Sequence, residues 1–147
     1  MIPRAPLLLG LAGLIPFLWG ALTLVSGGAA ELGVRTLGPR FVGPFVLLQY
    51  GTIILAFMSG VLWGFATRAP EGQAATGYAL SVLPALWAFF MVGGGPTASA
   101  VYLIAGFAGL LLLDWSFWRR GLAPEWWMQL RILLTVVVVA CLSLLVL

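Results

Sequence analysis

The apolar residues of this chain lie in long continuous runs, separated by short stretches that hold Gly, Pro, Arg and most of the acidic residues. A transmembrane helix needs about 20 mainly apolar residues, because it rises about 1.5 Å per residue across a hydrocarbon core about 30 Å thick. Five segments meet this requirement, at about residues 5–26, 41–67, 77–92, 98–118 and 130–147. The pattern predicts an all-α integral membrane protein, a five-transmembrane-helix bundle that forms one domain over residues 1–147.

The first segment also has features of a secretory signal, because Arg4 precedes it and the small residues Ser26-Gly27-Gly28-Ala29-Ala30 close it. The apolar region of a signal sequence has about 7–15 residues. This run is clearly longer and follows Met1. We therefore expect a retained membrane span.

The amino-acid composition argues against several kinds of functional site. The chain is 63% hydrophobic and 7% charged, whereas soluble domains are about 45–50% apolar and about 25% charged. There is no His or Lys and Cys141 is the single cysteine, which argues against metal sites, haem ligation, imidazole catalysis and an internal disulfide. The formal charge is +3, yet the Arg residues are dispersed and form no basic face for nucleic acid. We expect no catalytic, cofactor-binding or metal site, and hence no enzyme.

Arginine placement predicts the orientation, because cytoplasmic loops of membrane proteins carry an excess of basic residues. If the N-terminus is cytoplasmic, the outer side holds only Arg35 and Arg40, and five Trp residues lie at the inner boundary, the depth that indole rings prefer. We predict a cytoplasmic N-terminus and a periplasmic C-terminus. The inner side then holds Arg4, Arg68, Arg119, Arg120 and Arg131.

Small residues predict where the helices pack, because lipid gives helices no hydrophobic reason to associate and close backbone approach matters more. Ala56, Gly60 and Gly64 follow one another at i+4 steps, so we expect this track to lie inside the bundle. A ligand groove along such a stripe is the alternative. The other expected packing positions are Gly13, Pro16, Pro84 and Gly109.

Two prolines interrupt the first and third segments, and each removes the N–H that a carbonyl one turn earlier would receive. Residues 14–19 and 82–87 share Pro-x-Leu-Trp, and the segments that follow share a Tyr and a Trp thirteen residues apart. This similarity indicates a parallel two-plus-two repeat with a fifth helix added; chance similarity is the alternative. The prolines predict kinks that shape the bundle. A small polar pocket between them is the other interpretation, reached by Gln49, Tyr50, Thr52 and Ser81.

Asp114 is the only ionisable residue within an apolar run. A carboxylate at such a depth is normally partnered, so we predict an interfacial ion pair. A proton-carrying role is the alternative. The candidate partners on the same side are Arg68, Arg119, Arg120 and Arg131.

Aromatic and basic residues gather around the connection between the last two segments. Such a band anchors a helix at the headgroups, and it can also hold anionic lipid or a partner protein, since Trp and Arg dominate interface energetics. We expect one aromatic-basic band at the cytoplasmic interface that binds either anionic lipid or a partner protein. Its members are Trp115, Trp118, Arg119, Arg120, Trp126, Trp127 and Arg131.

Four motifs resemble the transmembrane protein 69 family, small multi-span proteins of unassigned function in proteobacteria and mitochondria. They are Ala12-Gly13-Leu14-Ile15-Pro16-Phe17, Tyr50-Gly51-x-Ile53-Ile54-Leu55-x-Phe57-x-x-Gly60-x-x-Trp63-Gly64, Tyr78-x-x-Ser81-Val82-Leu83-Pro84-Ala85-Leu86, and Pro124-x-Trp126-Trp127-x-x-Leu130-Arg131-x-x-Leu134-Thr135. The resemblance implies a bacterial inner-membrane location. It brings no activity, substrate or catalytic residue.

The short loops, small-residue faces and Trp/Arg edge favour an accessory, assembly or interaction subunit of a larger inner-membrane complex. Its expected partners are membrane lipids and either another membrane protein or further copies of the chain. A small-solute transporter or channel is the first alternative, and a lipid-binding membrane protein is the second.

The topology is directly testable. A reporter that is active only in the periplasm, fused after Leu147, should be active in intact bacteria, because five spans place the two ends on opposite sides. The same reporter fused after Arg68 should be inactive. Cytoplasmic activity of the Leu147 fusion would contradict the predicted orientation.

Overall fold

A computed structural model describes all 147 residues, as eight α-helices and one short 3₁₀-helix with no strand. The predicted all-α membrane bundle is confirmed. The helices are α1 (Arg4–Ala12), α2 (Ile15–Val25), α3 (Gly27–Thr36), η1 (Pro39–Phe41), α4 (Gly43–Ala66), α5 (Glu71–Ser81), α6 (Leu83–Met91), α7 (Pro96–Arg119) and α8 (Trp127–Ser143).

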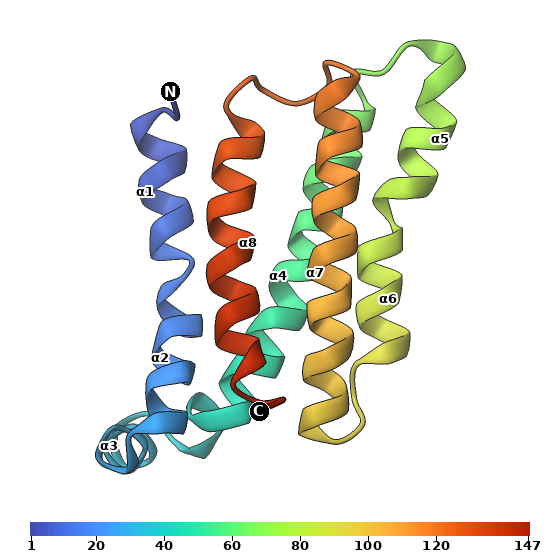
Figure 1. Cartoon of the computed structure of the whole chain (residues 1–147). Coiled ribbons are helices and arrows are strands. Elements are labelled where there is room, and N and C mark those ends of the chain that lie inside the picture. Colours follow the sequence, from blue (N-terminus) through green and yellow to red (C-terminus); the bar gives the residue numbers. More distant parts are fainter.

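The long helices stand side by side and alternate in direction, with the chain ends at opposite ends of the bundle (Figure 1). Four are long and apolar enough to cross a membrane: Arg4–Val25, Gly43–Ala66, Glu71–Met91 and Pro96–Arg119. The first combines α1 with α2, and the third combines α5 with α6. The apolar α8 is shorter, at 17 residues, and packs against both α7 and α2.

Two helices begin three or more residues before their predicted starts. The third span begins at Glu71, six residues before the predicted start at Gly77. The last begins at Trp127, three residues before Leu130. Polar and interfacial residues continue both helices beyond the apolar run, because a helix need not end where the hydrocarbon layer does.

Helix α3 lies across the end of the bundle that is opposite the N-terminus, where the sequence predicts only a connection (Figure 1). The Ser26 hydroxyl caps it by accepting the Ala29 N–H at 3.2 Å. Gly33 packs closely on the Trp19 and Val42 side chains, and a Cβ there would collide with Val42. The Trp19 indole N–H donates to the Phe41 carbonyl at 2.7 Å, so α3 and η1 are both held against α2.

Helix α4 is the centre of the bundle and packs on α2, α5, α6 and α7. A Cβ at Gly51 would lie 3.1 Å from Leu103, and one at Gly106 would lie 2.7 Å from Leu55, so these glycines allow α4 and α7 to approach closely. Large apolar side chains fill the rest of the interface. The fully buried ones include Phe17, Leu47, Leu55, Leu62, Leu103 and Phe107.

The predicted packing of Ala56, Gly60 and Gly64 inside the bundle is wrong. All three are exposed, and a Cβ at Gly60 or Gly64 would meet nothing within 4 Å. The buried face of α4 carries Leu55 and Leu62, which lie about 150° around the helix from the middle of the small-residue track. Large side chains that bury more area determined the inward face, and small residues occur on both faces.

The other expected packing positions differ in how deeply they are buried. Pro84 is buried, whereas Gly13 and Pro16 are half-buried. A Cβ at Gly13 would have the Tyr50 hydroxyl 3.9 Å away. A Cβ at Gly109 would meet nothing within 4 Å, so the predicted close contact there is also wrong.

Each proline follows an interruption in the helix of its span. Helix α1 ends at Ala12 before Pro16, and α5 ends at Ser81 before Pro84. The two broken spans run in the same direction, as the proposed repeat requires (Figure 1). At the first break, the N–H groups of Gly13 and Leu14 bond back to carbonyls of α1 at 2.9 and 3.0 Å.

The second break is bridged by a side chain of another helix. In an unbroken helix the Ala85 N–H would bond to the Ser81 carbonyl. Here the Ala85 N–H donates to the Ser59 hydroxyl of α4 at 3.1 Å, and that hydroxyl donates to the Ser81 carbonyl. The Ser81 hydroxyl in turn donates to the Tyr78 carbonyl at 2.7 Å. Ser59 therefore supplies both partners that the break removes.

Replacing Ser59 with Ala should lower the free energy of unfolding by about 1–3 kcal/mol, because it leaves a buried donor and a buried acceptor unpaired. Thermal unfolding in detergent measures this. Ser143→Ala is the matched control, since the Ser143 hydroxyl bonds only to the Val139 carbonyl of its own helix. Equal stability losses in the two variants would show that Ser59 does not bridge the break.

Candidate functional site

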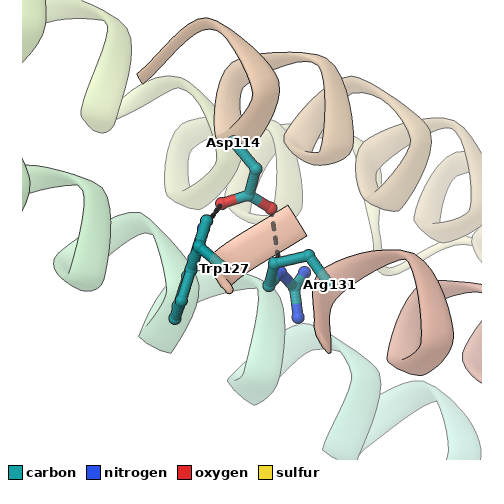
Figure 2. Close-up of polar contacts among 3 residues, drawn as sticks. All are labelled: Asp114, Trp127 and Arg131. Atoms are coloured by element: carbon teal, nitrogen blue, oxygen red, sulfur yellow. Dashed lines mark hydrogen bonds and ion pairs between the residues drawn. The ribbon is translucent and has the colours of Figure 1, made fainter. Parts of the chain in front are cut away.

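A buried cluster of three polar side chains, from Asp114, Trp127 and Arg131, joins α7 to α8 (Figure 2). Arg131 donates from Nε to Asp114 Oδ2 at 2.8 Å, and the Trp127 indole N–H donates to Asp114 Oδ1 at 3.0 Å. The Asp114 side chain is fully buried and that of Arg131 is 5% exposed. Trp127 and Arg131 are four residues apart, so both reach the carboxylate from one face of α8.

A tight turn after α7 brings α8 back against it. Gly121, with φ +75°, follows the end of α7, a backbone angle that glycine adopts without strain. The Gly121 N–H bonds to the Trp118 carbonyl at 3.0 Å, and the Leu122 N–H bonds to the Phe117 carbonyl at 3.1 Å. This is a Schellman cap. It reverses the chain so that Asp114 and the first turns of α8 meet.

The predicted aromatic-basic band divides into an outer and an inner part. Trp115 and Trp118 are 46% and 37% exposed, and Arg119 and Arg120 are exposed as well. Arg119 lies over the Trp115 ring, 5.0 Å from its centroid, and Arg120 donates to the Ser116 hydroxyl at 3.0 Å. Trp126 is half-buried.

Trp127 and Arg131 are buried, so they lie inside the bundle and not on the exposed part of the band. The physical reason is Asp114, which points into the bundle and requires donors there. Of the four candidate arginines, Arg131 pairs with it, whereas Arg68, Arg119 and Arg120 are exposed.

A cavity of about 500 Å³ lies beside the ion pair. Its wall is formed by α1, α2, α4, α8, the connection before α8 and Phe107 of α7, and 14 of its 20 lining residues are hydrophobic. Arg131 and Thr135 provide polar wall groups. A second groove, of about 730 Å³, lies between α6 and α7 and is lined by apolar residues such as Leu83, Trp87 and Leu112.

The predictions made from the sequence included neither Thr135 nor the cavity. The available signal was the spacing of Trp127, Arg131 and Thr135, each four residues apart and therefore on one face of α8. That polar stripe faces the one intramembrane carboxylate. An apolar wall with a few hydrogen-bond donors is an arrangement suited to binding.

Residues 2–147 match a family described as a protein of unknown function, DUF3429. The chain belongs to the DUF3429 family. With its apolar helices, this DUF3429 protein is a multi-pass membrane protein.

A curated relative bears out the resemblance seen in the motifs. Transmembrane protein 69 of Xenopus tropicalis is 34% identical over 143 residues, which are 93% of this chain and 51% of that protein. The DUF3429 chain therefore spans about half the length of this relative. No solved structure matches the chain.

The ion pair makes the DUF3429 bundle sensitive to loss of either charge. Asp114→Asn should lower the free energy of unfolding by about 3–5 kcal/mol, because Arg131 then stays buried without a counter-ion. Denaturation in mixed detergent micelles measures the change.

Two further variants make the test specific. Asp114→Leu combined with Arg131→Met should recover most of the loss, since an apolar pair of similar volume avoids the buried unpaired charge. Glu125→Gln, at an exposed carboxylate, should change little. A double variant no more stable than Asp114→Asn would show that the pair's charge balance is not the cause.

Proposed function

We propose that this DUF3429 protein is an accessory, assembly or interaction subunit of a larger complex in the bacterial inner membrane. The observation that carries the proposal is the outward small-residue track on α4, formed by Ala56, Gly60 and Gly64. Within the chain these residues make no close packing. On a helix in lipid, such a track allows a helix of another chain to approach closely.

The shape of this face supports the interpretation. Ile53, Phe57 and Trp63 are 56%, 63% and 49% exposed and stand beside the track as larger side chains. Larger side chains beside a track of small residues form apolar ridges against which side chains of a partner helix can pack. Trp63 also contacts Tyr78, with ring centroids 4.6 Å apart, so one ridge is held in place by α5.

The glycines have an energetic cost that packing against a partner would offset. Glycine within a helix is about 1 kcal/mol less favourable than alanine, and lipid contact does not require it. Gly60 and Gly64 have room for a side chain within this chain. A partner helix that packs against the backbone there explains why glycine occurs at both positions.

The exposed part of the aromatic-basic band supports placement at a lipid headgroup layer. Trp115 and Trp118 match the interfacial preference of indole rings. Arg119 and Arg120 lie beside them at the end of α7, where cations attract anionic lipid phosphates. These residues set the depth of the subunit and add membrane lipids to its partners.

Four of the five buried hydroxyls bond to backbone groups, which favours a subunit over a small-solute transporter. Ser59 and Ser81 bond to backbone groups at the α5–α6 break. The Thr23 hydroxyl accepts the Gly43 N–H at 2.7 Å and so caps α4. These groups are engaged in holding helices together, whereas a solute path needs polar groups that a solute can reach.

Gly60→Leu should detach the DUF3429 protein from its complex while leaving the fold intact, because leucine fills the partner's place without meeting anything in this chain. Native mass measurement after gentle detergent extraction reports the complex, and thermal unfolding reports the fold. Ala108→Leu is the control, an equally large change at an exposed position of α7.

The wild-type chain and Ala108→Leu should migrate with a larger species, and Gly60→Leu as a free chain. A Gly60→Leu variant that stays in the complex would exclude the α4 face as the contact. A wild-type chain that migrates alone as a monomer would overturn the subunit proposal itself.

A further inference from the structure

Two buried polar atoms of this chain have no hydrogen-bond partner, Arg131 Nη2 and Thr135 Oγ1. Every other buried side-chain nitrogen or oxygen has a partner. Both residues lie on the same face of α8, one helical turn apart, and both line the cavity beside the ion pair. The unmatched donors of the molecule are thus concentrated in one place.

The remainder of the cavity suits a hydrocarbon chain. Its walls include Leu9 of α1, Phe17 of α2, Phe57 and Val61 of α4, and Leu134 and Val138 of α8. Gly10 and Gly13 also line it and leave room beside α1. Its volume of about 500 Å³ falls within the range of about 300–1,000 Å³ for small-molecule sites.

Charge balance selects a neutral acceptor for the polar end. The Arg131 charge is already matched by Asp114 at 2.8 Å. A second anion would leave the buried group with a net negative charge, which a low-dielectric interior disfavours. A carbonyl oxygen can accept from the guanidinium and the hydroxyl without adding charge.

The depth of Arg131 in the membrane indicates which lipid carbonyl it can reach. Arg131 lies four residues after the start of α8, about 6 Å along the helix. The exposed Trp and Arg residues at that end mark the headgroup layer, which is about 5–7 Å thick on each side of the hydrocarbon core. Arg131 therefore lies at the inner edge of this layer, where the ester carbonyls of glycerolipids are found.

From these observations we infer that the cavity between α1, α2, α4 and α8 binds one ester-linked acyl chain of a membrane glycerolipid. The ester carbonyl accepts hydrogen bonds from Arg131 and Thr135, and the chain lies along the apolar wall. This site goes beyond the proposed subunit role and does not include the small-residue track of α4.

A pair of synthetic lipids tests the role of the carbonyl. The full chain is purified, depleted of lipid and titrated with dioleoyl phosphatidylcholine or with its diether analogue, which has equivalent chains and the same headgroup but no ester carbonyl. Native mass spectrometry measures the bound lipid. We expect the diester to bind about 5-fold more tightly or better, as the loss of a buried hydrogen bond implies.

Two substitutions locate the effect. Thr135→Val keeps the side-chain shape and should weaken diester binding several-fold while leaving diether binding unchanged. Leu134→Trp should fill the cavity and reduce both. Val136→Trp is the control, because the adjacent Val136 is 62% exposed and faces away from the cavity. It should bind both lipids as the wild-type chain does.

Three results would overturn the inference. Equal binding of diester and diether lipid in the wild-type chain would show that no carbonyl is recognised. Tighter binding of diester phosphatidylglycerol than of phosphatidylcholine, abolished by filling the cavity, would mean that Arg131 holds an anionic headgroup. Tighter binding of a ubiquinone at the same site would assign the donors to a quinone ring.

Discussion

Inside the hydrocarbon layer no water is available to bond with backbone or side-chain polar groups, so each group needs a partner within the protein. This constraint accounts for the most specific contacts of the bundle. The Ser59 hydroxyl takes the place of a helix bond lost before Pro84. The Thr23 hydroxyl caps the start of α4, and the Trp127 and Arg131 donors meet both oxygens of Asp114.

These bonds connect different spans. Ser59 joins α4 to the broken third span, Thr23 joins α2 to α4, and Asp114 joins α7 to α8. Lipid chains provide as apolar a setting as leucine side chains do, so helix association depends on such bonds and on close packing. Gly51 and Gly106 permit that packing between α4 and α7. The polar contacts thus fix which helices are neighbours.

The same constraint identifies two places where groups of this chain lack a partner within the chain. Arg131 Nη2 and Thr135 Oγ1 are buried without protein partners on two residues that line a cavity, and Gly60 and Gly64 expose helix backbone without a neighbour. The first place calls for a hydrogen-bond acceptor with an apolar tail. The second calls for another helix. The proposed lipid site and the proposed partner contact lie on neighbouring faces of α4, with Phe57 between them.

The sequence by itself determined the class of the molecule and the number of its long apolar elements, because burial in lipid requires apolar runs of a minimum length. It also placed the two helix breaks, since proline removes an N–H wherever it stands. The need of Asp114 for a partner followed from its depth alone.

Only the tertiary structure decided which faces meet. The spacing of Ala56, Gly60 and Gly64 is that of a packing stripe, yet Leu55 and Leu62 turn the other face of α4 inward. Arg119, Arg120 and Arg131 are equivalent as charges, but the turn at Gly121 brings only Arg131 to Asp114. The partner of a side chain depends on how helices rotate and approach, and that is decided by the packing of the whole bundle and not by any one segment.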